Sequence, residues 1–204
     1  MQKGLGALIA ILSAFIFTSC QKEISGLLED TNTQQKIELE GNYKFVSVEA
    51  NTNVSNEITD GSDVLKAVTV TAYRSQNNAG TVKLDATTLT LTGVTYSIDT
   101  TLKVYNYLNG TLTDSLESPL QVTLPPSNFS NSFNRVSNDS LYFPSGFIMV
   151  NNTPLPSTGA GVKLHTAGNL LYMDLTQSQE GIQDQGIPVH VIVRIKLRLT
   201  LQKT

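Results

Sequence analysis

The stretch VHVIVRIKLRLTL, residues 189–201, alternates apolar and polar side chains for longer than any other part of the chain. The aliphatic side chains that fall on one face are Val189, Val191, Val193, Ile195, Leu197, Leu199 and Leu201. His190, Arg194, Lys196, Arg198 and Gln202 fall on the other face, with Ile192 as the exception. A period of two residues predicts a β-strand with one face on a core. At about 3.3 Å per residue this strand is roughly 45 Å long, so it must bend or wrap around a sheet.

Shorter runs with the same period begin at Ile37 and recur along the chain. The segment from Leu102 to Leu116 predicts a hairpin, because Asn109-Gly110 supplies the two positive-φ residues of a type I′ turn. No stretch keeps a helical period. The sequence therefore predicts one all-β antiparallel domain over residues 37–204, built as a β-barrel or a β-sandwich.

Polar segments between the apolar runs predict turns and loops. These segments are Asn51–Asn56, Asp60–Asp63, Gln76–Gly80, Asn151–Gly161 and Gln177–Gly186, with Gly93 as a break inside an apolar run. Pro125-Pro126 is expected to stop a short strand and to open a long loop over Ser127–Ser140.

The first residues differ from the rest. The apolar run Leu5–Phe17 has roughly 13 residues, which matches an export signal and is shorter than a membrane span. It ends in the small residues before Cys20, which is the only cysteine of the 204 residues. We expect a signal peptide over residues 1–19, cleavage between Ser19 and Cys20, and a flexible tether over residues 20–36.

Phe17-Thr18-Ser19-Cys20 resembles the lipobox of bacterial lipoproteins, with Phe17 where that family usually has leucine. The resemblance implies that Cys20 carries acyl chains on its sulfur and its amino group, which attach the protein to the cell envelope at the outer membrane. Gln21-Lys22-Glu23 is similar to the charged start of Bacteroidota-type lipoproteins. Both the periplasmic and the surface-exposed face of that membrane stay open.

Gly41-Asn42-Tyr43-Lys44-Phe45 resembles the opening strand of lipocalin-like lipoproteins, with Tyr43 where that family has tryptophan. The resemblance implies a barrel with Tyr43 at one end, and Arg194 or Arg198 packed across the tyrosine ring. Lipocalins carry a helix after the barrel, whereas this chain ends in its long strand. A lipocalin-like barrel is the preferred form of the all-β prediction.

Charge and composition exclude several functions. Lys and Arg number 14 against 17 Asp and Glu, a net charge of −3, which gives no basic surface for nucleic acid. A single cysteine leaves no disulfide within the chain. His165 and His190 do not have the spacing of a zinc site. No Gly-x-Ser-x-Gly motif or phosphate-binding glycine loop occurs. We expect neither an enzyme nor a cofactor.

Two functions remain. The first is a small hydrophobic ligand bound in an apolar cavity of the β-domain. The second is a structural or accessory role, in which the aromatic, Asn-rich segment at Phe129–Phe133 contacts an envelope protein or a glycan. A core filled by its own side chains favours the second function, and an unfilled apolar cavity favours the first.

Overall fold

The computed structural model describes residues 36–147, 149–150, 153–154, 159–184 and 186–204. These residues form strands and no helix, which confirms the all-β class. In chain order the strands are β1 (Gly41–Asp60), β2 (Asp63–Arg74), β3 (Gln76–Leu84), β4 (Thr88–Leu108), β5 (Thr111–Ser132), β6 (Asn134–Ser137), β7 (Ser140–Phe143), β8 (Met149–Val150), β9 (Thr153–Pro154), β10 (Ala160–Ala167), β11 (Leu170–Asp184) and β12 (Pro188–Lys203). The predicted signal peptide, Ser19, Cys20 and nearly all of the tether lie outside the described residues.

Ten of the strands form one antiparallel sheet, and β8 pairs with β9 separately. In this sheet β1 lies next to β12 on one side, and on the other side its two halves pair with β3 and β2. β4 pairs with both β2 and β3, and β5 pairs along the length of β4. Beyond β12 the order continues through β11, β10, β7 and β6.

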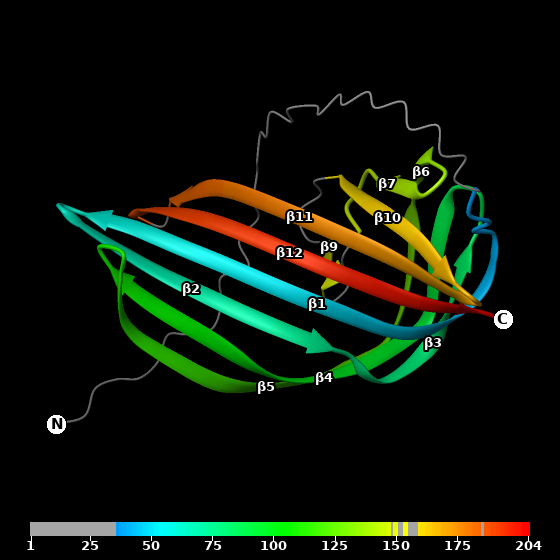
Figure 1. The fold of residues 1–204 in the computed structure, drawn as a ribbon, viewed down its shortest axis with the longest axis horizontal. Coiled ribbons are helices and arrows are strands. Elements are labelled where there is room, and N and C mark those ends of the chain that lie inside the picture. The colour runs from blue at the N-terminus through cyan, green and yellow to red at the C-terminus, as the bar shows by residue number, and fades with distance from the viewer. Residues whose placement is uncertain (1–35, 148, 151–152, 155–158, 185) are drawn as a thin grey trace.

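The sheet is elongated and curled (Figure 1). The turns of the β1–β2, β4–β5 and β11–β12 hairpins lie at one end of the long axis, and the C-terminus lies at the other. The two edge strands, β5 and β6, are separated in sequence by Phe133 alone, yet no ladder joins them among the described residues. The sheet therefore curls as a barrel does, without a ladder that closes it.

The core lies inside the curl, towards the end with the C-terminus, where short and long strands meet. Its most completely buried side chains include Phe45, Leu84, Phe133, Leu141, Phe143, Met173, Leu175 and Leu201. Burying a leucine or phenylalanine stabilises the fold by roughly 1.5–3 kcal/mol. On β12 the predicted inner residues Val191, Leu199 and Leu201 are buried, whereas Arg194 and Lys196 are exposed. This confirms the prediction that one set of alternating side chains in residues 189–201 faces the core and the other faces outward.

The start of β1 differs from the lipocalin-like expectation. Tyr43 is buried, and its hydroxyl donates a hydrogen bond to the carbonyl oxygen of Leu39 at 2.7 Å. The prediction that Arg194 or Arg198 packs across this ring is wrong. Both arginines lie on the outer face of β12, opposite to Leu199 and Leu201, and Arg198 contacts Asp174 and Tyr172 instead.

The predicted Asn109-Gly110 hairpin is confirmed, with φ values of 50° and 80° at the two turn residues. The side chain of Asn109 also joins two hairpin ends. Its Oδ1 accepts a hydrogen bond from the Val64 backbone N–H at 2.8 Å, and its Nδ2 donates to Asp63 Oδ1 at 2.9 Å. The turn predicted at Asp60–Asp63 is present too, with Gly61 at φ 61°.

Three predicted loops are wrong, because strands continue through them. Residues 51–56 belong to β1 and pair with both β2 and β12. Most of residues 177–186 belong to β11, which pairs with β12 as far as Asp184. Residues 127–140 contain the end of β5, all of β6 and the start of β7. In each case the ladder supplies backbone hydrogen bonds whatever the polarity of the side chains.

Pro125-Pro126 does not end its strand, because β5 is an edge strand. The ladder to β4 pairs Leu124 with Tyr96 and Ser127 with Val94, so the two prolines occupy a bulge between these pairs. A third proline, Pro119, lies opposite Thr101 in the same strand. Proline has no N–H to donate and is tolerated at edges and bulges.

The turn predicted at Gln76–Gly80 is an irregular part of β3, and Gly93 is a bulge inside β4 rather than a break. Asn77, Gly80 and Gly93 have φ values of 52°, 108° and 60°. Of the loop predicted at Asn151–Gly161, residues 151–152 and 155–158 lie outside the described residues, and Thr153–Pro154 forms β9.

Candidate functional site

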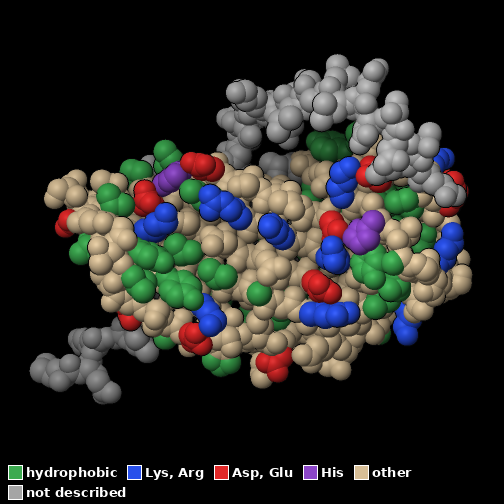
Figure 2. Space-filling model, viewed as in Figure 1, with side chains coloured by type: hydrophobic (Ala, Val, Ile, Leu, Met, Phe, Trp, Pro, Cys, Tyr) green, Lys and Arg blue, Asp and Glu red, His purple; other side chains and the backbone are tan. Residues whose placement is uncertain are grey.

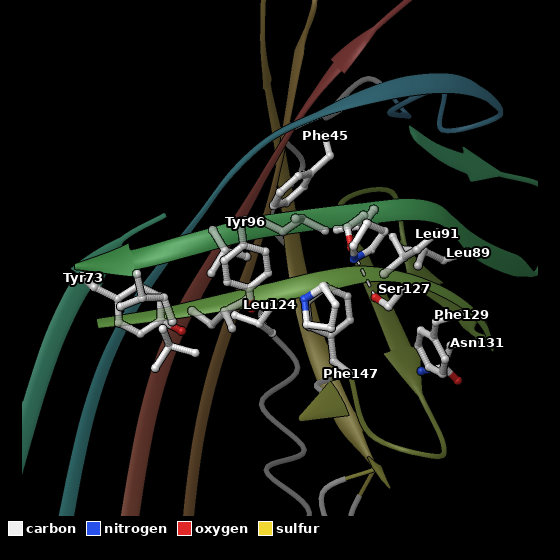
Figure 3. A pocket seen from close by; sticks show the side chains of 18 of the residues that line it. Phe45, Tyr73, Leu89, Leu91, Tyr96, Leu124, Ser127, Phe129, Asn131 and Phe147 are labelled. Carbon is white, nitrogen blue, oxygen red and sulfur yellow. Dashed lines mark hydrogen bonds between the residues drawn. The ribbon is translucent and has the colours of Figure 1, made fainter. Parts of the chain in front are cut away.

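A cavity of about 650 Å³ lies on the inner face of the curled sheet (Figure 3). β4 and β5 supply most of its lining, namely Leu89, Leu91, Val94, Tyr96, Ile98, Val122, Leu124, Pro125, Pro126, Ser127, Phe129 and Asn131. The rest of the lining consists of Phe45 and Val48 of β1, Tyr73 of β2, Leu197 and Leu199 of β12, and Phe143 and Phe147.

The pairing of β4 with β5 brings these side chains together. Successive side chains of a strand point to opposite faces, so every second residue of each strand faces the cavity. The ladder then sets Tyr96 opposite Leu124 and Ile98 opposite Val122. The bulges at Gly93 and at Pro125-Pro126 shift the register between these pairs and the pair of Leu91 with Phe129.

Aromatic rings from separate segments form the middle of the cavity wall. The rings of Phe45 and Tyr96 lie 5.9 Å apart between centroids, and those of Phe143 and Phe147 lie 4.8 Å apart. Figure 3 shows Phe45, Tyr96 and Phe147 converging on the same space. Tilted ring pairs at these separations add about 0.5–1.5 kcal/mol beyond the area that they bury. The rings therefore hold the wall in a defined shape.

The two non-aromatic polar side chains in the lining, Ser127 and Asn131, form hydrogen bonds within the protein. Ser127 Oγ donates to the carbonyl oxygen of Val94 at 3.3 Å, and Asn131 Nδ2 donates to the carbonyl oxygen of Gly146 at 2.6 Å. No Asp, Glu, Lys, Arg or His belongs to the described lining. Such a surface is suited to apolar groups and has no fixed charge to bind an ion.

The tyrosines of the wall stay uncharged. Burial raises the pKa of Tyr73 to about 12, with the charge of Tyr96 as a second cause, and burial also raises the pKa of Tyr96. Both phenols are therefore protonated at physiological pH and can donate one hydrogen bond each. The cavity is apolar with a small number of neutral polar groups.

The outer face carries a separate polar cluster. Arg198 Nε and Nη2 donate to the two carboxylate oxygens of Asp174 at 2.7 and 3.0 Å, and His165 Nδ1 lies 3.3 Å from Asp174 Oδ2. The His165 ring stacks on Tyr172 at 4.5 Å between centroids. The hydrogen bond to Asp174 raises the pKa of Arg198. These groups satisfy one another at the surface, where ion pairs contribute about 0–1 kcal/mol.

Charges of both signs are scattered over this face (Figure 2). The pairs of Lys66 with Glu57 and of Arg74 with Glu49 have N–O distances of 3.6 and 3.5 Å. His190 contacts Glu180 at 2.7 Å. In the part of the chain that the structure describes, no group of three His, Cys, Asp or Glu side chains is arranged to hold a metal ion. Nor do those residues include a helix long and apolar enough to cross a membrane.

The cavity includes residues that the sequence did not identify. Phe129 and Asn131, which were expected in a loop that contacts a partner, line the cavity, and Phe133 is buried in the core. Tyr73 and Tyr96 lie in stretches of alternating apolar and polar residues, which predict strands but not a place in a cavity. Their alternation was visible in the sequence, whereas the pairing that brings their strands to one site was not.

Comparisons with known proteins give no match to this chain, whether to a protein-family model, to a curated protein or to a solved structure.

Proposed function

We propose that this protein is a lipid-anchored protein of the bacterial cell envelope whose β-domain binds a small hydrophobic ligand. The observation that carries the proposal is the cavity of about 650 Å³, lined by apolar and aromatic side chains. Sites for small molecules have volumes of about 300–1,000 Å³ and are mostly apolar, with a few polar groups that orient the ligand. The domain acts by binding and carries no catalytic group in the proposal.

The accessory role, the alternative, drew on the tether and on an aromatic, Asn-rich loop at Phe129–Phe133. Phe129 lines the cavity and Phe133 is buried in the core, so these aromatic side chains do not support that role. A ligand in the cavity explains why the aromatic side chains of this segment face inward beside an unfilled space.

A charge placed in the cavity wall should abolish most of the binding. Val122 lines the cavity and is 42% exposed, so we expect the Val122→Asp variant to fold. An apolar ligand in the cavity would then lie against a carboxylate, which is unfavourable. We expect the dissociation constant of the neutral fluorescent probe N-phenyl-1-naphthylamine to rise at least about tenfold, which corresponds to 1.4 kcal/mol. The measurement is a fluorescence titration of the domain that begins at Gln21.

The matched control is Thr123→Asp. Thr123 pairs with Ser97 and points to the opposite face from Val122, so its substitution should leave probe binding unchanged. Native mass spectrometry of the domain purified without detergent tests for a ligand retained from the host. A probe that binds both variants as well as the parent protein would contradict the cavity as the site.

The lipid anchor is the second part of the proposal and is supported by the sequence pattern at Phe17–Cys20. Because the chain has one cysteine, Cys20→Ser removes the only thiol that an acyl chain can modify. We expect the full-length protein to incorporate an alkyne-labelled palmitate in a bacterial host, and the Cys20→Ser variant to incorporate none. Ser19→Ala keeps a small residue before the cysteine and should retain the label. Equal labelling of the Cys20→Ser variant would disprove the anchor.

A further inference from the structure

We propose that the ligand is an amphiphile with one long acyl chain, which extends from the cavity along the inner face of β4 and β5. This inference rests on the proposed function, because it names the class of ligand that the cavity takes. Such a chain would cover the part of the inner face that lies between the cavity and the β4–β5 turn.

An apolar stripe continues from the cavity along these two strands. Ile98 and Val122 form the last pair that lines the cavity. Further towards the turn, the same face carries the pairs Thr100 with Leu120, Leu102 with Ser118, and Val104 with Leu116. Each of these pairs has at least one aliphatic side chain. Leu116 is 60% exposed, although it lies on the face that is buried farther along the sheet.

The stripe is long and narrow. From Ile98 to Val104 it extends about 20 Å, and two strands give it a width of about 10 Å. On the side of β2 the residue paired with Val104 is Thr69, and on the other side lies the free edge of β5. A compact ring system would fill the cavity and leave the stripe uncovered, whereas an extended hydrocarbon chain would cover both.

A polar pair ends the stripe. Asn106 lies opposite Asp114, on the same face as Val104 and Leu116 and one step nearer the turn. The backbone N–H of Ser115 donates to Asp114 Oδ1 at 2.8 Å, which leaves the other carboxylate oxygen to accept from a ligand. We therefore place the end of the chain in the uncharged cavity and a hydroxyl-bearing head beside Asn106 and Asp114.

The occupant is a lipid chain rather than a protein. On this face of β4 and β5, the cavity and the stripe form one continuous path from Leu91 to Leu116 without a charged side chain. A flexible hydrocarbon chain can follow such a path from the open face into the curl, where a folded partner cannot enter. Each CH₂ that the stripe removes from water stabilises the complex, so a longer chain should bind more tightly.

The test compares two neutral ligands that differ only in chain length, monopalmitoylglycerol and monooctanoylglycerol, by displacement of N-phenyl-1-naphthylamine below their micelle concentrations. The variant is Leu116→Asp, and the matched control is Ser115→Asp, whose side chain points outward beside Tyr105. We expect Leu116→Asp to weaken binding of the palmitoyl ligand about tenfold and that of the octanoyl ligand less than about twofold. Ser115→Asp should change neither, and Val122→Asp should weaken both.

The outcomes separate the two proposals. If Leu116→Asp affects both ligands equally or neither, or if neither acylglycerol displaces the bound probe, the long-chain inference fails while the cavity stands. If the parent protein binds neither the probe nor either acylglycerol, the proposed function fails. Because Leu116 and Ser115 are both exposed, circular dichroism should show the parent fold for both variants.

Discussion

Phe133→Ala is expected to lower the free energy of unfolding by about 3–5 kcal/mol, which is the usual cost of removing a buried phenylalanine ring. Phe133 is 2% exposed, and its ring lies 5.5 Å from that of Phe143 between centroids. Its backbone N–H donates to the carbonyl oxygen of Thr87 at 2.8 Å. This residue alone connects β5 to β6, so its side chain holds the two edges of the sheet to a common core.

Urea denaturation followed by circular dichroism measures this loss. The control is Val136→Ala on β6, because Val136 is 68% exposed and should change stability by no more than about 0.5 kcal/mol. Since Phe143 packs in turn on the cavity residue Phe147, we also expect the Phe133 variant to bind the naphthylamine probe less tightly. Similar stabilities for the two variants would show that the curled end does not depend on this ring.

Gly80→Ala is expected to cost about 2–4 kcal/mol, from backbone strain and from overpacking together. Gly80 has φ +108°, which side chains rarely adopt, and a Cβ there would lie 2.6 Å from Val94 Cα and 2.7 Å from the Gly93 oxygen. These atoms belong to the backbone of β4, so they cannot move without shifting the strand. Val94 lines the cavity, and the strain would therefore reach the candidate site.

Gly93→Ala is the matched control for this prediction. Gly93 also has a positive φ, at +60°, but a Cβ there meets no atom within 4 Å. Its substitution should cost only the left-handed conformation itself, about 1–2 kcal/mol. Thermal and urea unfolding of the two variants give the comparison. A Gly93 variant as unstable as the Gly80 variant would mean that conformation, rather than the close approach of β4, makes Gly80 necessary.

Side-chain alternation was enough to predict the fold class and the inner face of β12. Turn chemistry was enough to predict the Asn109-Gly110 hairpin, because few residue pairs accept two positive φ values. Strand length was underestimated where polar residues interrupt the pattern. Residues 51–56 pair with neighbours on both sides, and such pairing depends on distant segments that local composition does not report.

The sequence predicted an apolar cavity as one of two possibilities, but not its residues. Phe45 and Tyr96 meet across the cavity although they are far apart in the chain. The pairing shifts in register next to both residues, between Phe45 and Ser47 and between Leu91 and Tyr96. A bulge moves every later side chain relative to its partner strand, and local patterns do not reveal where pairing slips by one residue.

The edge strand β5 has a consequence for the behaviour of the protein at high concentration. A strand of 22 residues that is paired on one side only is a template on which other chains can add by backbone hydrogen bonding, the first step towards fibrils. Pro119, Pro125 and Pro126 interrupt this template, because each lacks the N–H that an incoming strand requires. The residues predicted to end a strand thus interrupt the free edge of a long one, and we expect them to limit the addition of other chains to it.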